Sequence, residues 1–530
     1  MAIFIEHPCE RVLVAQPHAR VRPGIAVGAW VLIAAILGSA MPSIDGTAVN
    51  VILPMLQRDL HADARGVQWI VEGYALFLSA LILVGGGLGD VYGRRRIFVI
   101  GTAMFAVSSI GCAVSTSIAQ LITARCLQGL SAALLVPESL ALISAQFPQT
   151  ERGKAIGTWS AFSAMSTAVG PLLGGYLAQY LSWRWVFFIN VPIAAAIIYL
   201  SIRHVDESRD PGAGKSVDVL GAVLASAGLG GLTYALIASQ GRTPSPSVIT
   251  VGLLALCTIA FFVYYEKRVS APMMPLKFFR SRRFAGANAY TLLLYAGLGG
   301  SMFFIPFNLI NVQHYSPTAA GAAMLPMILL LFLLSRFSGA VQSRIGPRVV
   351  LFLGALVAAA AFILFAFTGQ GRSYWTSFFP ASVVLGLAAA AFVAPLTATV
   401  MNSIETAHAA IASGINNAVA RTAGLVAVAV LGIVLTSVFY HSYDAAILNV
   451  TLSSQSRATL AHDRDLMVTG YLPKSVAATE RQAIAGAVQN AFIGGFRSTM
   501  ICSALLACAA ALTALITLRE NQDSAGAFGK

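Results

Sequence analysis

Charged residues are scarce in this chain. Of its 530 residues only 10% are Asp, Glu, Lys or Arg, whereas 57% are hydrophobic and the mean hydropathy is +0.77. Soluble globular domains carry about 25% charged residues, because their surfaces face water. The composition therefore excludes an ordinary soluble domain and indicates a protein whose surface faces lipid.

Cysteine and the sequence signatures of catalysis are scarce as well. Five of the six cysteines lie in apolar runs and the other, Cys9, lies in the polar N-terminal segment, so the chain implies neither a disulfide framework nor a metal site. An HExxH motif, a GxSxG motif, a Walker-type loop and clustered Cys/His ligands are all absent. We therefore expect neither an enzyme nor a bound cofactor.

Long apolar runs are abundant. A helix needs about 20 mostly apolar residues to cross a bilayer, and fourteen runs reach that length. A polar leader, residues 1–23, precedes the first run and has no convincing small-residue cleavage site, so we expect this run to be a retained helix. The sequence predicts an all-α integral membrane protein with fourteen transmembrane helices. The runs begin near Gly24, Gly66, Ile97, Ile118, Lys154, Trp185, Val219, Val248, Phe284, Thr318, Val349, Ser373, Ala409 and Val488.

The distribution of Lys and Arg predicts the orientation of these helices. Most of the basic residues fall in the connections on one side, among them 94–96 and 267–283, and the short loops on the other side hold few. Basic loops stay inside, so we expect both termini in the cytoplasm and the protein in the inner (cytoplasmic) membrane. Contact of these loops with anionic lipid also explains the formal net charge of +13, and nucleic acid is not an expected partner.

Two segments recur about 255 residues downstream. The turn Gly86–Arg96 has a weaker echo at Gly339–Arg348, and a small-residue segment that starts at Gly129 returns at Gly386. Such internal repeats are typical of transporters built from two related halves. The spacing predicts two pseudo-symmetric six-helix halves with a pair of inserted helices between them. The expected divisions are 1–23 (leader), 24–203 (first half), 204–283 (linkers and inserted pair), 284–518 (second half, with an external loop at 441–487) and 519–530 (tail).

The turn Gly86–Arg96 combines an acid, four glycines and three arginines between two apolar runs. Charges at the bilayer centre cost about 2.5 to 3.5 kcal/mol each on insertion scales, so this turn must lie at a water interface. Anchoring on the inner side of the membrane would by itself explain its arginines. Asp90 is different, because the topology does not require an acid there.

A stripe of small residues marks the run that begins near Lys154. Gly170, Gly174 and Gly175 leave one helix face without side chains, so a neighbouring backbone can approach closely, and Pro171 permits a bend. A bent and closely packed helix suits a rocking interface. Ordinary packing in a static bundle is the alternative.

Four local patterns together resemble the major facilitator superfamily, in particular its fourteen-helix drug:proton antiporter branch, over nearly the whole chain. The turn is similar to that superfamily's loop between its second and third helices, and Asp45–Pro54 and Arg125–Ala133 are similar to signatures of the branch. Gly170–Gly175 is similar to a motif associated with antiport, although Ser166 replaces its usual first glycine. The resemblance implies a conformational lock formed by Gly86, Asp90, Gly93, Arg94 and Arg95, and an antiport motif formed by Gly170, Pro171, Gly174 and Gly175.

Four ionisable residues within apolar runs are the candidates for proton coupling: Asp45, Glu72, Arg125 and Glu138. Each costs insertion energy and is therefore a functional candidate. Asp45 could instead cap the outer end of its helix, Glu72 could reach outside water beside Trp69, and Glu138 could reach inside water. Arg125 requires a partner acid, for which Asp45 and Glu138 are the alternatives.

Polar and aromatic residues in the same runs are candidates for substrate binding. Asn416, Asn417 and Arg421 are similar to an Asn-Asn-x-x-Arg segment of the branch, although hydrogen bonding between helices explains them equally well. Tyr74 could line a cavity or contact lipid. The candidate substrate-binding residues are Asn50, Tyr74, Gln128, Asn416, Asn417 and Arg421.

These observations predict proton-coupled efflux of drugs or other amphipathic or cationic small molecules by alternating access. A proton-coupled symporter and an exporter of one specific metabolite on the same fold are the alternatives. The expected partners are the small-molecule substrate, protons and the lipid bilayer, and we expect a monomer. The 441–487 segment either connects two helices or contacts a periplasmic adaptor protein.

Overall fold

The structure is a computed structural model that describes residues 25–209, 218–240, 244–269, 272–369, 373–404, 409–448, 450, 452–470 and 480–518. The leader 1–23 and the tail 519–530 lie outside these residues. Within the described residues all regular secondary structure is helical.

The elements are grouped below by the two halves and the inserted pair that the sequence predicts. The first half contains α1 (Ile25–Asp59), α2 (Ala64–Tyr92), α3 (Arg94–Val114), α4 (Ile118–Gln146), α5 (Gln149–Tyr180), α6 (Arg184–Phe188) and α7 (Asn190–His204). The inserted pair is α8 (Val219–Ala238) and α9 (Pro246–Glu266). The second half contains η2 (Leu276–Arg280), α10 (Arg282–Phe307), η3 (Asn308–Val312), α11 (Pro317–Ala322), α12 (Leu325–Ala366), η4 (Tyr374–Thr376), α13 (Phe378–Met401), α14 (Ala409–Ile447), α15 (Ser454–His462), α16 (Arg464–Met467) and α17 (Arg481–Thr517).

The number of helices agrees with the prediction. In the described part of the chain, 13 helices are long and apolar enough to cross a bilayer. The fourteenth long helix is α5, which has 32 residues, packs against α1 and is rich in Gly, Ser and Thr. The expectation of an all-α membrane protein is confirmed.

One backbone feature recurs in both halves. Gly93, with φ 113°, separates α2 from α3, and Gly346, with φ 80°, interrupts α12 directly before Pro347. Side chains disfavour this region of backbone space, whereas glycine adopts it freely. α12 is therefore two helices joined by a kink, at the place where the sequence predicts a boundary near Val349.

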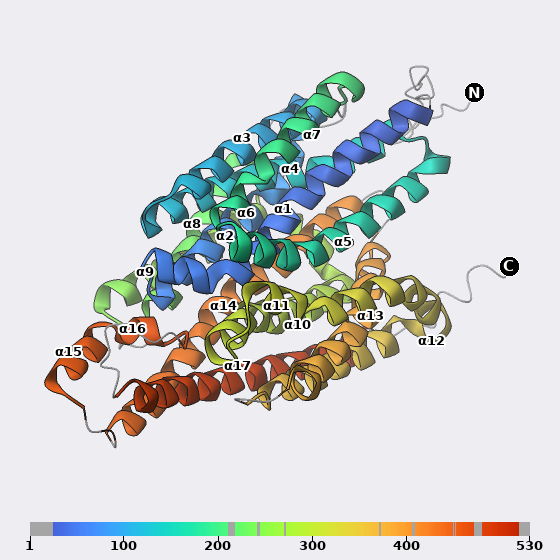
Figure 1. The fold of residues 1–530 in the computed structure, drawn as a ribbon. Helices are drawn as coiled ribbons and strands as arrows, with labels where there is room; N and C mark the ends of the chain where they lie inside the picture. The colour runs from blue at the N-terminus through green and yellow to red at the C-terminus, as the bar shows by residue number, and fades with distance from the viewer. Residues whose placement is uncertain are drawn as a thin grey trace, which may run out of the picture.

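The two halves lie side by side along the bundle (Figure 1). The first half is drawn in blue to green and the second in yellow to red, and α8 packs against both α2 and α14. We call the end where α2 meets α3 the Arg94 end, and the opposite end, where α1 finishes, the Asp59 end. α1 starts at the Arg94 end and α2 returns to it.

Hydrogen bonds join the halves at the Asp59 end. The Arg58 guanidinium of α1 donates to the Asn311 side chain at 2.8 Å, and the backbone N–H of Thr318 donates to Gln179 of α5 at 3.3 Å. The Arg65 guanidinium of α2 lies 3.0 Å from the Asp465 carboxylate of α16. The structure therefore has its two halves fastened to each other at this end.

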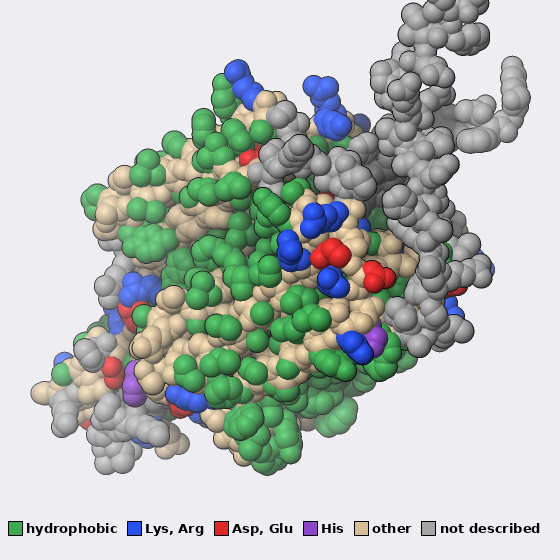
Figure 2. Space-filling view, turned by 90° about the horizontal axis from the view of Figure 1, so that it is seen from above, with side chains coloured by type: hydrophobic (Ala, Val, Ile, Leu, Met, Phe, Trp, Pro, Cys, Tyr) green, Lys and Arg blue, Asp and Glu red, His purple; other side chains and the backbone are tan. Residues whose placement is uncertain are grey.

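Much of the outer surface is apolar, as a lipid-facing surface requires. Hydrophobic side chains spread over much of the face shown in Figure 2, and charged side chains are confined to a few groups, one of them near the middle of the view. In the most apolar stretch of α9 only 6% of the residues are buried, and Leu253 and Leu254 are about 60% exposed. In water these side chains would form a large unfavourable patch, whereas lipid tails accommodate them.

The expected external loop at 441–487 is shorter than predicted. α14 continues to Ile447, α17 begins at Arg481, and the short helices α15 and α16 lie between them. Hydrogen bonds from Ser456 and Ser453 to the Glu480 carboxylate lower its pKa and tie the ends of this connection together. The helices outrun the loop boundaries because their ends are polar, and polar residues carry no hydropathy signal.

Candidate transport site

Asp45 lies within α1, far from its ends. The side chain is buried, and α1 continues past it to Asp59. The interpretation of Asp45 as a cap of the outer helix end is therefore wrong, because the apolar run that contains it is shorter than the helix. Asp45 instead places a carboxylate inside the first half, where only protein groups can solvate it.

Arg125 of α4 is the partner of Asp45. Its Nη1 lies 2.5 Å from the Asp45 Oδ2, and both side chains are at most 1% exposed. Its Nε donates to the backbone carbonyl of Ile70 on α2, and Nη1 also donates to the Gln128 side chain at 2.6 Å. The expected partner acid exists, and the structure selects Asp45 over Glu138.

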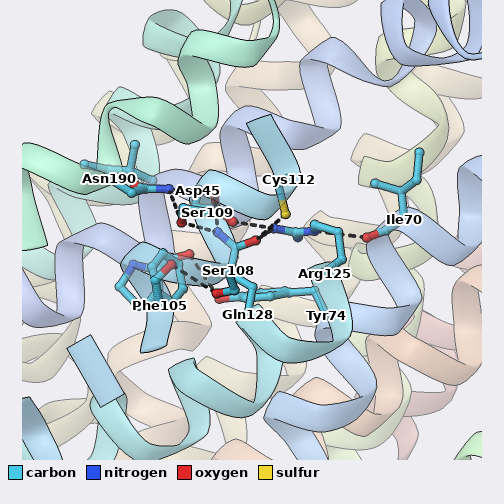
Figure 3. A network of polar contacts seen from close by, with 12 residues as sticks. Asp45, Ile70, Tyr74, Phe105, Ser108, Ser109, Cys112, Arg125, Gln128 and Asn190 are labelled. Atoms are coloured by element: carbon cyan, nitrogen blue, oxygen red, sulfur yellow. Dashed lines mark hydrogen bonds and ion pairs between the residues drawn. The ribbon is translucent and has the colours of Figure 1, made fainter. Parts of the chain in front are cut away.

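Two amides complete the surroundings of the carboxylate (Figure 3). Gln128 of α4 and Asn190 of α7 each donate to the Asp45 Oδ1 at 3.0 Å, and both also donate to the Ser109 hydroxyl of α3. Sequence reasoning missed Asn190 and Ser109. Asn190 could have been found, because it stands in the Trp183–Pro192 segment, where an amide is out of place among apolar residues.

Tyr74 of α2 covers the guanidinium. The Arg125 Cζ lies 4.2 Å from the centre of the Tyr74 ring, and the Tyr74 hydroxyl donates to the Pro42 carbonyl of α1. Such cation–π contacts stabilise a desolvated cation by about 2 kcal/mol. Tyr74 is 6% exposed, so it does not contact lipid. The Asp45–Arg125 pair is thus enclosed by groups from α1, α2, α3, α4 and α7.

This arrangement replaces the water that a buried carboxylate lacks. Three donors converge on Asp45, and a buried ion pair survives only if further hydrogen bonds repay its desolvation. A proton or a cation that reaches Asp45 would compete directly with Arg125. The chemistry available here is therefore the exchange of one positive charge for another at a fixed carboxylate.

Glu72 of α2 is buried away from this network. It is 1% exposed, and its Oε2 has no hydrogen-bond partner among the described residues. The interpretation of Glu72 as an interfacial side chain in outside water is wrong, because tertiary packing covers it. A buried acid without a full set of partners is costly, which makes Glu72 a second candidate for proton binding.

Glu138 of α4 lies against the Gly86–Arg96 turn rather than beside Arg125. It is fully buried, and neither carboxyl oxygen has a hydrogen-bond partner in the described part of the chain. Its carboxyl group fills the space that a side chain at Gly89 would occupy. The interpretation that Glu138 reaches inside water is wrong. Its position instead couples α4 to the Gly86–Arg96 turn.

The turn itself is folded onto the first half. Arg94 donates to Asp90 through Nε at 3.0 Å and Nη2 at 2.7 Å, one helical turn apart. Glu207, which follows α7, accepts from the backbone N–H groups of Arg95 and Arg96 and so caps α3. Glu207 was missed, because nothing in its local sequence distinguishes it from other linker acids. A lock between the halves at Asp90 stays a prediction.

The two other glycines of the lock differ in how closely they are packed. A side chain at Gly93 would meet the Glu207 carboxylate at 2.7 Å, whereas one at Gly86 would meet Pro137 of α4 at 3.6 Å, which is ordinary van der Waals contact. The structure therefore requires a glycine at position 93 and not at position 86.

The glycine stripe of α5 packs in two directions. Gly170 and Gly174 lie against α1 at Thr47 and Ala48, whereas Gly175 lies against the Pro317 backbone of α11 in the second half. In the reverse sense, Gly321 of α11 lies against the backbone carbonyl of Pro171. The predicted close approach exists, and part of it crosses between the halves at the Asp59 end.

The candidate substrate-binding residues do not gather at one place. Asn416 of α14 donates to Asn288 and Thr291 of α10, which is hydrogen bonding between helices of one half. Asn417 is exposed, and Asn50 is half-buried with an Oδ1 that has no hydrogen-bond partner within the described ranges. Arg421 of α14 lies within electrostatic range of Tyr74, across the boundary between the halves.

The described residues contain no group of three or more His, Cys, Asp or Glu side chains that could hold a metal ion, and their five cysteines are free. The titratable groups of the site are therefore the isolated acids and arginines described above.

A profile of the Major Facilitator Superfamily matches residues 35–429, which is most of the chain. The chain belongs to the major facilitator superfamily. It is 33% identical over 504 residues to the tetracenomycin C resistance and export protein of Streptomyces glaucescens, covering 93% of this chain and 92% of that protein. It is 35% identical over 414 residues to the multidrug resistance protein Stp of Mycobacterium tuberculosis, covering 77% and 75%.

Other relatives within this superfamily are also resistance proteins. The methylenomycin A resistance protein of Bacillus subtilis is 32% identical over 414 residues, covering 77% of this chain and 88% of that protein. Among solved structures, an inward-facing bacterial homologue of the human lysosomal transporter Spinster has a TM-score of 0.63 at 16% identity, covering 93% of this chain and 99% of that chain. The resemblance to the superfamily and its resistance exporters is confirmed.

Proposed function

We propose that this protein exports drug-like small molecules from the cell in exchange for protons. The observation that carries the proposal is the buried Asp45–Arg125 ion pair, held by Gln128 and Asn190 in the middle of the first half. A membrane protein keeps such a pair at high cost, and acids of this kind mark proton pathways. The resistance and export proteins among the relatives support export as the direction.

In the proposed cycle the two halves rock about a central site. A proton that reaches the first-half acids from outside neutralises a carboxylate and weakens its hold on Arg125. Substrate bound from the cytoplasm then displaces the proton. One charge that crosses 100 mV supplies about 2.3 kcal/mol before any pH gradient is added, which is sufficient to bias such an equilibrium.

The hydrogen bonds and ion pair that join the halves at the Asp59 end indicate which state of the cycle this structure represents. With the Arg94 end in the cytoplasm, as the basic loops predict, the observed state is closed toward the outside. We infer that Arg58, Arg65 and the α5–α11 contact must separate before substrate can leave.

Drug-stimulated proton movement in proteoliposomes tests the proposal. Purified protein is reconstituted with a pH-sensitive dye inside the vesicles, and tetracenomycin C, methylenomycin A and puromycin, the compounds that appear in the names of its relatives, are added in turn. We expect at least one to accelerate proton movement and the Asp45→Asn variant to abolish that response. The matched control is Asp206→Asn, because Asp206 is exposed and lies outside the transport site.

Vesicles that show no acceleration with any of these compounds or with cationic dyes would contradict proton-coupled export. Movement of proton and drug in the same direction would instead identify a symporter.

A further inference from the structure

The inserted helix α8 brings a polar side chain to the boundary between the halves. The Gln240 Nε2, just after the end of α8, donates to the Gln68 side chain of α2 at 2.7 Å and to the Ala429 carbonyl of α14 at 3.2 Å. Gln240 is 4% exposed and Gln68 is 2% exposed. One glutamine of the inserted pair therefore contacts both halves of the protein.

Glu72 lies on the face of α2 that α8 covers. Gln68, Glu72 and Leu76 are spaced by four residues and share one face of the helix. Gln68 contacts Gln240 at one end of this face, and Leu76 lies 3.2 Å from the position of a side chain at Gly230 at the other end. Glu72 is thus bracketed by two contacts to α8.

A second unpartnered group lies on the same face of α8 as Gly230. Thr233 follows Gly230 by three residues, is fully buried, and has a hydroxyl without a hydrogen-bond partner among the described residues. The Oε2 of Glu72 is also buried and has no hydrogen-bond partner among these residues. Two buried polar groups that lack partners on facing helices indicate a position for ordered water or for a transferred proton.

A polar pocket opens at the Asp59 end of this seam. It is small, with room for about one water molecule, and its polar lining comes from Arg65, Gln240, Thr436, Tyr440 and Asp465. The pocket and the Glu72 face of α2 are therefore joined through Gln240 and Gln68.

We propose that α8 lines a proton route from the Asp59 end to Glu72, through the pocket and past Gln240 and Gln68. The inference rests on the proposed proton coupling and names the entry to it. Ordered water carries protons over short distances, and the Gln240 and Gln68 amides hold such water by hydrogen bonds, whereas the apolar residues around this seam cannot.

The charged groups near Glu72 are few. α8 carries no Asp, Glu, Lys or Arg between Val219 and Ala238, Arg421 of α14 interacts with Tyr74, and the guanidinium of Arg125 on α4 is paired with Asp45. At the mouth of the route, Arg65 and Tyr440 both contact the Asp465 carboxylate, and the Arg464 guanidinium lies over the Tyr440 ring. Glu72 therefore exchanges its proton with the pocket rather than with a neighbouring charge.

Hydrogen–deuterium exchange of the Glu72 carboxyl group tests the route without any drug. Reconstituted protein is transferred to D₂O, and infrared difference spectra follow the carboxyl band that disappears in the Glu72→Gln variant. We expect Gln240→Leu to slow this exchange by about tenfold, the rate equivalent of one buried hydrogen bond. Thr436→Val changes only the hydroxyl at the pocket and should slow exchange in the same direction.

Gln313→Leu is the matched control. Gln313 lies at the same end, but it donates to the Gly369 carbonyl within the second half at 2.8 Å and is not on the route. The proposal would be overturned if the Glu72 carboxyl group exchanged at the wild-type rate in both Gln240→Leu and Thr436→Val. It would also be overturned if no carboxyl band depended on Glu72. Failure of drug-stimulated proton movement in the wild type would overturn the proposed function alone, because the exchange needs no substrate.

Discussion

At the residue scale, the Asp45–Arg125 pair shows how one buried charge determines the identity of its neighbours. Arg125 is completely enclosed, so its guanidinium needs an acid, a carbonyl and a ring to replace water, and Asp45, Ile70 and Tyr74 supply them. Asp45 in turn needs donors, and Gln128 and Asn190 supply these. Each residue of the network is explained by the charge that it solvates.

Removal of one partner of this pair should cost far more than removal of both. Asp45→Asn leaves an uncompensated guanidinium and Arg125→Gln leaves an uncompensated carboxylate, so each should destabilise the protein by about 3 to 5 kcal/mol. The double variant removes both charges and should regain most of that loss. Thermal unfolding of the three variants in detergent measures the difference. Additive losses in the double variant would contradict the pairing.

The sequence alone predicts the ionisable residues of the site but not the contacts that they make. Asp45, Glu72, Arg125 and Glu138 could be found from the sequence, because ionisable residues in apolar runs are conspicuous. Their pairing could not, since both Asp45 and Glu138 were plausible partners of Arg125. Ser109 and Glu207 have common neighbours in the sequence, and only the folded chain shows what they contact.

At the element scale, the glycines of α5 pack against α1 in the same half and against α11 in the other half. Gly170 and Gly174 allow α5 to approach α1 within the half, whereas Gly175 allows it to approach α11 in the other half. A helix that packs by backbone contact on two sides can release one contact and keep the other. The antiport motif therefore combines a fixed face and a separable face on one helix.

Methyl groups at the separable face should open the Asp59 end. Gly175→Ala and Gly321→Ala each place a methyl group against a backbone carbonyl of the opposite half, and such overpacking costs about 1 to 3 kcal/mol. The state with a closed Asp59 end should therefore lose population. Distances between spin labels introduced by Tyr180→Cys and Ala319→Cys, both exposed positions, measure this opening.

The control for that experiment lies on the same helix. Gly157 has no atom within 4 Å of the position that a methyl group would take, so Gly157→Ala should leave the label distances unchanged and stabilise α5 by about 0.5 to 1 kcal/mol. Equal label distances in Gly157→Ala, Gly175→Ala and Gly321→Ala would show that the α5–α11 contact does not hold the Asp59 end closed.

Helix boundaries were predictable where a charged or glycine-rich turn interrupts an apolar run, as at Gly93 between α2 and α3. They were less so where helices extend into polar sequence, as α14 and α17 do around the 441–487 segment. The packing of α8 against α2 and α14 could not be predicted, because an inserted pair has no equivalent in the repeat from which its neighbours could be inferred.

At the scale of the whole molecule, the halves, the inserted pair and the connection between α14 and α17 meet at the Asp59 end. α16 approaches α1 there, since the Gln57 side chain donates to the Leu466 carbonyl at 3.1 Å and accepts from Thr469 at 2.7 Å. The connection thus contacts the protein's own first half. This favours a connecting role over a dock for an adaptor protein, although both remain predictions for this segment.

We predict that the Arg94 end lies in the cytoplasm and the Asp59 end outside, because the connections at the Arg94 end are rich in Lys and Arg. In intact cells a membrane-impermeant thiol reagent should label Ala458→Cys on α15 and leave Arg96→Cys on α3 unlabelled, because both positions are exposed but lie at opposite ends. Both variants are made in a chain whose native cysteines are replaced. Permeabilised cells should label both, which shows that each thiol is reactive. Labelling of Arg96→Cys in intact cells would reverse the orientation and, with it, the direction assigned to the proton route, because the pocket at Arg65 and Gln240 would then open to the cytoplasm.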